Sequence, residues 1–179
     1  KYVVITGFRN VRIGNIDDFL NRFHLKNEPT VEIQFFNAER VGSWQHLYFA
    51  AVNALTAFKN KENISKSLAM ETVLYASAQR QIRKATELLG IKPNTSEIAV
   101  LIIGENAKVV KSALSIISKQ LKMPEDETVL KLSKEKLRIV QDVFEIENSE
   151  LETIAKRDCL EEALKNLVIE RMALLATQH

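Results

Sequence analysis

The stretch between residues 59 and 84 concentrates side chains that can bind an anionic ligand. Its basic residues are Lys59, Lys61, Lys66, Arg80, Arg83 and Lys84. Against them stand only Glu62 and Glu71, so the stretch has a net charge of +4 in a chain whose net charge is +2. The aromatic residues in and just before it are Trp44, Tyr48, Phe49, Phe58 and Tyr75. Cations neutralise phosphates and aromatic rings stack on unpaired bases, so the combination predicts a surface for single-stranded nucleic acid. The aromatic residues have a second interpretation as core side chains, which we favour for Trp44 and Phe58.

Polar residues in the same stretch offer hydrogen bonds that would complete such a surface. Asn63, Ser65 and Lys66 lie where a helix is predicted to begin, and the free N–H groups of a helix N-terminus attract phosphate. Glu71 interrupts the apolar stripe of that helix, and two interpretations of it stay open. Its carboxylate accepts a hydrogen bond from a base amino group or a ribose hydroxyl, or it pairs within the protein with Arg80 or Lys66.

The rest of the chain offers little that would support catalysis or metal binding. Its three histidines are not spaced as a helical metal-binding pair, and neither an HExxH nor a CxxC motif occurs. Ser43 is expected to cap a helix rather than to act as a nucleophile. Gly104 ends a predicted strand as in a phosphate-binding loop, but no glycine-rich motif follows and Glu105 would repel a phosphate. The single cysteine, Cys159, is expected to be a buried structural thiol. We therefore expect a protein that is not an enzyme and that binds no cofactor or metal.

Composition and charge are those of a globular protein with two different surfaces. Of 179 residues, 46% are hydrophobic and 27% charged, with only five glycines and three prolines, which predicts one packed domain over residues 1–179. No apolar run is long enough to cross a membrane and no signal peptide is recognisable, so we expect a cytoplasmic protein without a membrane partner. Residues 145–162 carry a net charge of −5, in contrast to the basic stretch. This segregation indicates either two surfaces with different partners or two ordinary solvated helix surfaces.

Hydrophobic periodicity predicts a mixed α/β fold, in which a sheet is flanked by helices and residues 43–90 form a helical lobe. Strands are predicted at 2–8, 31–36, 97–104 and 128–132, and the third is expected to be buried on both faces because it is apolar throughout. The predicted helix caps are Asn15 or Asp17, Ser43, Ser65, Ser133 and Ser149. One interpretation of the last helical stretch breaks it near Asp158. Its final residues, MALLATQH (172–179), are either helix or a short strand. The alternative arrangement is an open doubly wound sheet.

Three blocks of sequence carry a resemblance to a known family. They are NAERVGSWQHLYFAAVNALTAF (37–58), NISKSLAMETVLYASAQRQIRKATELLGI (63–91) and NLVIERMALLA (166–176). They resemble the PRPK-binding subunit family of the KEOPS complex, in its archaeal type, over nearly the whole chain. The family pattern has an acid where this chain has Asn37 and a glycine where it has Ala78. In the family that glycine implies a turn at Ser77–Ala78, which would divide 63–90 into two helices and make Ser77 the cap of the second. Ala78 is a good helix former and does not require this break, so one continuous helix stays open as the alternative.

The resemblance implies a non-catalytic accessory subunit. KEOPS installs the threonylcarbamoyl group on an adenosine next to the anticodon of tRNA. This family binds the PRPK-type kinase/ATPase subunit, helps to stimulate it, and holds the single-stranded 3′ CCA end of tRNA. On this hypothesis the RNA-binding residues are Lys59, Asn63, Ser65, Lys66, Glu71, Ser77, Arg80, Arg83 and Lys84. The kinase-binding residues are expected on an exposed apolar face of the C-terminal helix, and the candidates are Val168, Ile169 and Met172.

Two other classes of function stay open on the sequence. A small-molecule-binding α/β domain would have its pocket near Gly104. A pure protein–protein scaffold would have no RNA role. Stabilisation by a nucleotide alone would favour the first class, and failure to bind tRNA would favour the second.

Overall fold

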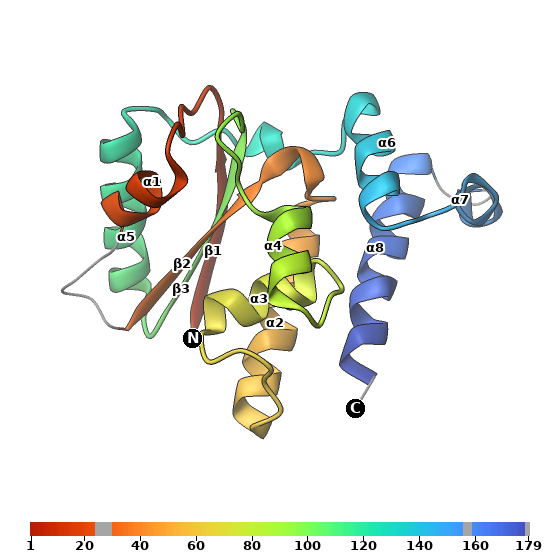
Figure 1. The fold of residues 1–179 in the computed structure, drawn as a ribbon, viewed down its shortest axis with the longest axis horizontal. Helices are drawn as coiled ribbons and strands as arrows, with labels where there is room; N and C mark the ends of the chain where they lie inside the picture. Colours follow the sequence, from red (N-terminus) through yellow and green to blue (C-terminus); the bar gives the residue numbers. More distant parts are fainter. Residues whose placement is uncertain (24–29, 156–158, 178–179) are drawn as a thin grey trace.

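The framework of the protein is a three-stranded antiparallel sheet (Figure 1). The computed structural model describes residues 1–23, 30–155 and 159–177. The strands are β1 (Tyr2–Phe8), β2 (Val31–Asn37) and β3 (Ile98–Gly104), in the order β1–β3–β2. Central β3 pairs with both neighbours, so that Val100 lies opposite Thr6 on one side and Phe35 on the other. These three strands and the mixed α/β class are confirmed. The alternative of a doubly wound sheet is wrong, because both strand pairs in the described part of the chain are antiparallel.

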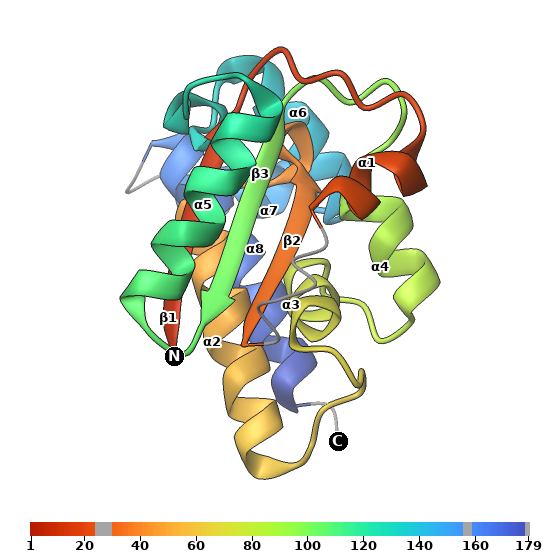
Figure 2. The ribbon, with the colours of Figure 1, turned by 90° about the vertical axis from the view of Figure 1, so that its left-hand side faces the viewer.

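Helices cover both faces of this sheet (Figures 1 and 2). One face carries α1 (Ile16–Arg22) and α5 (Ala107–Leu121). The other face carries α2 (Trp44–Asn60), α3 (Leu68–Ala76) and α4 (Ile82–Leu89). Two separate cores result, one on each side of the sheet.

Strand β3 contributes to both cores, because successive side chains of a strand point to opposite faces. Ile98, Val100 and Ile102 pack under α1 and α5. Ala99, Leu101 and Ile103 pack under α2, α3 and α4. All seven residues of β3 are therefore buried, which explains its uninterrupted apolar sequence.

The C-terminal helices form a third cluster beside α2. They are α6 (Lys134–Val143), α7 (Asn148–Ala155) and α8 (Leu160–Thr177). Leu164 and Val168 of α8 pack with α6 and α7, whereas Met172 and Leu175 reach the core under α2 to α4. The break predicted near Asp158 lies outside the described residues. Within the described ranges, no helix combines the length and the hydrophobicity that a membrane span requires.

The segment predicted as a fourth strand, 128–132, forms a short 3-10 helix, η2 (Glu127–Leu130), at the edge of β1, so this prediction is wrong. The side chain of Asp126 caps η2 by accepting from the N–H of Thr128 (3.0 Å), and the Asp126 N–H donates to the Gly7 carbonyl (2.8 Å). The Val129 side chain packs directly against Gly7 of β1. Any larger residue at position 7 would clash, because its β-carbon would lie 2.1 Å from a Val129 methyl group. Lys136 donates to the Val129 carbonyl (2.8 Å), and burial lowers the pKa of this lysine to about 8. The local cap and these contacts prevail over the strand propensity of the segment.

Most predicted helix caps are confirmed, with two exceptions. The caps whose side chains accept a bond from a first-turn N–H are Asn15, Ser43 and Ser133. Helix α3 is capped by Ser67, whose side-chain oxygen accepts from the Met70 N–H, and not by Ser65, whose hydroxyl oxygen accepts from the Ser67 N–H ahead of the helix. Ser149 lies inside α7, and its hydroxyl contacts the Glu147 carboxylate (3.3 Å).

Of the two alternatives for 63–90, the structure has the turn at Ser77–Ala78 that the family pattern implies, and this turn separates α3 from α4. Ala78 is in the left-handed region, with φ of 52°. Its N–H donates to the Tyr75 carbonyl (3.0 Å), and the Gln79 N–H donates to the Leu74 carbonyl (3.1 Å), which is the Schellman closure of a helix. Ser77 does not cap α4, because its hydroxyl donates back to Leu74 (3.1 Å) and ends α3.

A buried histidine holds this turn against the start of α2. His46 accepts from the Gly42 N–H through Nδ1 (3.1 Å), so Nε2 carries the proton and donates to the Ala76 carbonyl (2.7 Å). The ring also packs edge-on against Phe144, with centroids 5.3 Å apart. Burial lowers the pKa of His46 to about 4, against the opposing effect of the bond to Ala76. The neutral imidazole is therefore the form that connects the two helices.

Replacing Ala78 by glycine should raise the free energy of unfolding by about 1 kcal/mol, because a β-carbon in the left-handed region carries about that much strain. Urea denaturation measures the change. Ala173→Gly, at an exposed position inside α8, is the matched control and should lower the same free energy by about 1 kcal/mol. Equal destabilisation by both substitutions would contradict the turn.

The stability of the protein should fall as the pH drops from about 6.5 to about 4. In that interval the unfolded chain protonates His46, whereas the folded chain, in which its pKa is about 4, does not. The loss should reach about 3 kcal/mol and level off below pH 4. Urea denaturation of wild type and His46→Asn from pH 4 to pH 8 isolates this contribution. Parallel pH profiles for the two proteins would disprove it.

Candidate nucleic-acid interface and docking surface

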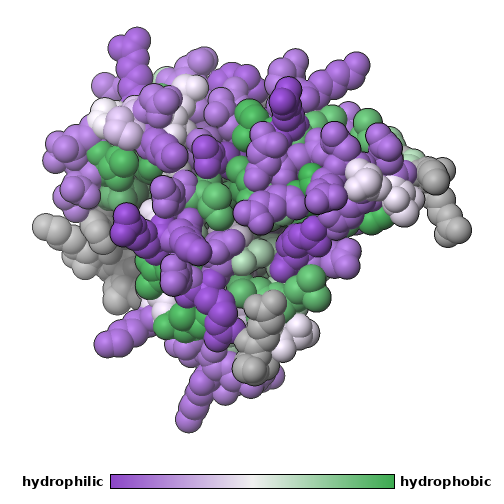
Figure 3. Space-filling model, turned by 45° about the vertical axis from the view of Figure 1, so that its right-hand side comes forward, coloured by the Kyte–Doolittle hydropathy of each residue, from purple (hydrophilic) through white to green (hydrophobic). Residues whose placement is uncertain are grey.

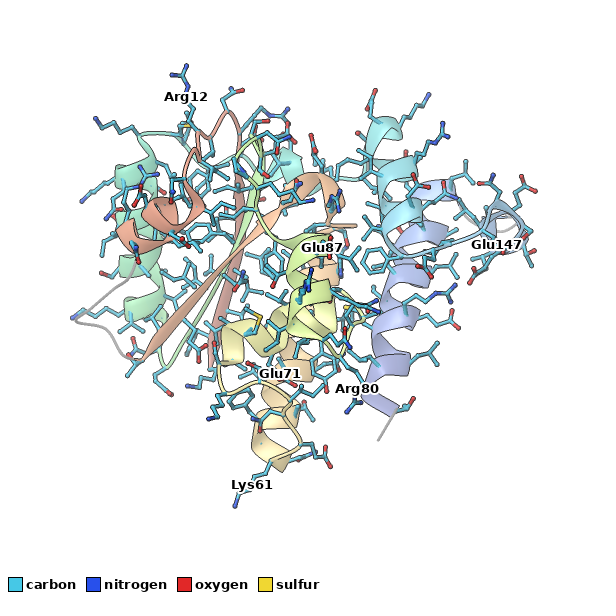
Figure 4. All side chains as sticks on the ribbon, viewed as in Figure 1. Arg12, Lys61, Glu71, Arg80, Glu87 and Glu147 are labelled. Carbon is cyan, nitrogen blue, oxygen red and sulfur yellow. The ribbon has the colours of Figure 1, made fainter. Side chains whose placement is uncertain are left out.

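The basic stretch begins with Lys59 in the last turn of α2 and continues into the segment that joins α2 to α3, residues 61–67, which we call the α2–α3 loop. Helix α2 closes on Lys61, which is left-handed with φ of 61°. The N–H of Lys61 donates to the Phe58 carbonyl (3.3 Å) and that of Glu62 to the Ala57 carbonyl (2.9 Å). This closure turns the chain sharply and starts the loop at the tip of α2 (Figure 4).

Glu71 holds the α2–α3 loop from inside. Its side chain is fully buried, and its carboxylate accepts from the backbone N–H groups of Ile64 (3.0 and 3.1 Å) and Ser65 (2.6 Å). Hydrogen bonds to an ionised carboxylate are stronger than those between neutral groups. Of the two interpretations that the sequence leaves open, the burial supports an internal role, with backbone N–H groups as donors. It does not match a direct contact with RNA.

A second carboxylate, Glu32 of β2, holds the other end of the loop. It accepts from the Ser67 hydroxyl (2.9 Å) and from the Ala69 N–H (2.6 Å), while the Ser67 oxygen accepts from the Met70 N–H (3.3 Å). The first amides of α3 are thus occupied by the protein's own side chains, so the phosphate site predicted near Ser65 is filled. Sequence reasoning missed Glu32, because only the pairing of β2 into the sheet brings it to a helix 35 residues away.

The uncharged polar residues predicted to bind RNA are part of the same internal network. Asn63 donates to the Ser65 carbonyl (2.9 Å), and the Ser65 hydroxyl accepts from the Ser67 N–H (3.2 Å). Ser65 and Ser77 are buried, and Asn63 is half-buried. These side chains shape the loop and the turn.

The basic residues, in contrast, are all exposed. Those at the end of α2 and in the loop are Lys59, Lys61 and Lys66; those in the turn and on α4 are Arg80, Arg83 and Lys84. In Figure 4, Lys61, Glu71 and Arg80 lie toward the same end of the molecule. The turn between α3 and α4 therefore brings cations from two parts of the sequence into one region.

Unlike α2 and α3, helix α4 begins without a side-chain cap. Gln81 precedes it and makes no capping bond, and its first turn contains no acidic residue. Arg83 and Lys84 lie in that turn, so cations occur together with backbone N–H groups that the Gln81 side chain does not cap. Arg40 anchors the far end of the helix by donating to the Leu88 carbonyl (3.1 Å). The start of α4 is therefore better suited to an anion than the start of α3.

Helix α2 exposes an aromatic face, which we define as Trp44, Tyr48, Phe49 and Val52. These residues are 52%, 43%, 42% and 38% exposed. The rings of Trp44 and Tyr48 lie 6.2 Å apart and those of Tyr48 and Phe49 5.6 Å apart, both in edge-on contacts. The prediction of Trp44 as a core residue is wrong, because α2 packs on the sheet through its two leucines and its alanines. Exposed apolar clusters of this kind mark interaction sites.

The other two aromatic residues of the basic stretch are not free to stack on bases. Phe58 is half-buried against the core under α2 to α4, as expected. Tyr75 is buried in α3. Burial raises the pKa of Tyr75, and the charges of Glu71 and Glu62 add to this, so the phenol stays protonated.

The exposed apolar face predicted on α8 is wrong for two of its three residues. Val168 and Met172 are fully buried, and Ile169 is half-buried against the core under α2 to α4. Helix α8 lies between two clusters, so its apolar residues are used on two sides. Figure 3, which brings the side of α6 to α8 forward, shows hydrophobic groups there as separate patches among hydrophilic ones. Two leucines of α8 stay exposed, Leu160 and Leu174.

The pocket expected near Gly104 is filled. A β-carbon on Gly104 would lie 2.7 Å from Val110, so the strand end is packed against α5. A mostly apolar cavity of about 500 Å³ lies instead between β2, α1, α3 and α4, with Ile33 and Met70 in its lining. The expectation of a buried Cys159 is also wrong, because this residue is exposed just before α8.

Comparison with known proteins agrees with the resemblance read from the sequence blocks. The regulatory protein Cgi121 of Methanocaldococcus jannaschii is 28% identical over 144 residues, which are 80% of this chain and 85% of that protein. The model of the family described as kinase binding protein CGI-121 matches residues 8–176, a range that contains β2, β3, the basic stretch and all but the last residue of α8. The resemblance is confirmed, and this chain belongs to the CGI-121 family of kinase-binding proteins.

Proposed function

We propose that this protein is a non-catalytic regulatory subunit of the KEOPS complex, which forms threonylcarbamoyladenosine in tRNA. In this role it binds and stimulates the PRPK-type kinase/ATPase subunit and recruits tRNA through its single-stranded 3′ CCA end. The descriptions of the family as kinase-binding and of its relative as regulatory support the kinase partner. The basic surface around the uncapped start of α4 carries the RNA part of the proposal.

The RNA surface consists of exposed cations on four segments: the end of α2, the α2–α3 loop, the turn after α3 and the start of α4. It comprises Lys59, Lys61, Lys66, Arg80, Arg83 and Lys84. Uncapped N–H groups at the start of α4 add to its attraction for phosphate. Ile82, which is 46% exposed in the same turn, offers an apolar contact for a base. An RNA strand therefore finds charge, backbone donors and an apolar group at one helix start.

The kinase-docking surface is the aromatic face of α2, in place of the buried residues of α8. Tryptophan and tyrosine are the most frequent anchors of protein interfaces. Residues 44–58 contain no charged side chain, so the helix that carries the aromatic face has no cations for phosphates. Helix α2 has 17 residues and is about 25 Å long, which separates Trp44 at its start from Lys61 after its end. Both partners can therefore bind at the same time.

Reversing two charges of α4, in Arg83→Glu/Lys84→Glu, should weaken tRNA binding about 10-fold or more. The slope of log K against log salt concentration should also flatten by about 0.7 for each phosphate that the variant no longer neutralises. Filter binding of tRNA with and without its CCA end, at several salt concentrations, measures both quantities. Wild type should bind the tRNA that ends in CCA more tightly.

The control for this experiment is Lys108→Glu/Lys111→Glu on α5. These lysines are also exposed, and they lie across the sheet from α4, so the same change of charge should alter tRNA binding by less than about twofold. Equal binding of both tRNAs by all three proteins would remove the RNA role and leave a protein–protein scaffold.

Replacing Trp44 by glutamate should raise the Kd for the purified PRPK-type kinase subunit about 10-fold or more, because it removes an aromatic anchor and buries a charge in the interface. Isothermal titration calorimetry measures the Kd, and circular dichroism checks the fold. Leu20→Glu, at an exposed apolar residue of α1, should leave the Kd unchanged. An unchanged Kd for Trp44→Glu would place the kinase site elsewhere.

A further inference from the structure

We propose that Glu32 and Glu71 are positioning residues of the RNA surface, which fix the α2–α3 loop in its binding shape before RNA arrives. The inference rests on the RNA-binding function proposed above. Neither carboxylate touches RNA. Each acts through hydrogen bonds to residues on one side of Lys66.

The two carboxylates reach the loop from different parts of the fold. Glu71 on α3 binds the N–H groups of Ile64 and Ser65, at 2.6 to 3.1 Å. Glu32 on β2 binds the Ser67 hydroxyl and an N–H in the first turn of α3, at 2.9 and 2.6 Å. Lys66 lies between these contacts, with its side chain exposed. Its backbone is thus held on both sides, by a helix and by the edge strand of the sheet.

Order of this kind favours binding, because a flexible loop loses conformational freedom when its ligand binds. Fixing the backbone of one residue costs about 1–2 kcal/mol. A loop that is already ordered in the free protein does not incur this cost on association, so its affinity is higher for the same contacts. Glu32 and Glu71 therefore increase RNA affinity, although their carboxylates and the phosphates of RNA are both negatively charged.

The negative charge of the two acids makes it possible to distinguish a positioning role from a purely electrostatic one. If the two acids acted only through their charge, neutralising either of them would tighten RNA binding, since like charges repel. If they act by ordering the loop, neutralising either of them weakens binding. The number of phosphates contacted in the complex stays the same, so the slope of the salt dependence does not change. The two roles thus predict changes of opposite sign.

The test compares Glu71→Gln and Glu32→Ala with Glu87→Gln as the control. Glu87 is an exposed acid farther along α4 (Figure 4), so its neutralisation changes charge near the RNA surface without freeing the loop. Filter binding of a tRNA that ends in CCA gives affinity and salt slope, and amide hydrogen exchange reports the order of the loop. We expect both loop variants to bind about 3- to 10-fold more weakly with unchanged slope. Exchange should accelerate at Ile64 and Ser65 in Glu71→Gln and at Ala69 in Glu32→Ala, whereas Glu87→Gln should bind as tightly as wild type or more tightly.

The other possible outcomes would contradict either the positioning role or the proposed RNA-binding function. Loop variants that exchange faster but bind as tightly as wild type, or more tightly, would overturn the positioning role. A reduced salt slope would also overturn it, because it would mean that the complex neutralises fewer phosphates. If Glu71→Gln fails to fold, the half-buried Glu32 decides by the same criteria. Failure of wild type itself to bind tRNA would overturn the proposed function, whatever the exchange rates.

Discussion

The burial of β3 on both faces is the constraint from which the rest of the structure follows. None of its side chains is polar, so the sheet must be covered by helices on each side. Helices α2, α3 and α4 are consecutive in the chain and cover the same face, so their connections fall next to one another. The basic residues lie at the ends of these helices and in their connections, and the cover of β3 thereby brings them together.

Two left-handed residues, Lys61 and Ala78, end α2 and α3 and direct the chain into the loop and the turn. Closing these helix ends uses the polar groups nearby, since buried N–H and carbonyl groups must find partners. Glu71 and Ser65 accept hydrogen bonds from backbone N–H groups of the loop. At the turn, the Ser77 hydroxyl donates to a backbone carbonyl of α3. Lysine and arginine side chains are long and strongly hydrated, so they stay outside. The predicted binding set thus separates into an inner polar network and an outer layer of cations.

His46 connects the two regions to which we assign partners. It lies near the start of α2, two residues after Trp44 of the aromatic face, and it donates to the carbonyl of Ala76 just before the turn. Its ring is neutral because burial disfavours the imidazolium form. In the proposed function, the same buried side chain therefore supports the helix that docks the kinase and the turn that leads to the RNA surface.

The sequence by itself determined the three strands, most helix caps and the cations, and its resemblance to a family offered the turn at Ser77–Ala78 as one of two alternatives. These are local features: side-chain alternation, capping oxygens and a motif each depend on neighbouring residues. Only the tertiary structure decided which faces are exposed. Val168 was expected to be exposed and is buried, whereas Trp44 was expected in the core and is exposed. The sequence does not show which elements pack against an apolar side chain, and these elements decide its burial. Glu32 joined the loop, and the fourth predicted strand became η2, because contacts distant in sequence supplied the bonds that decided between local alternatives.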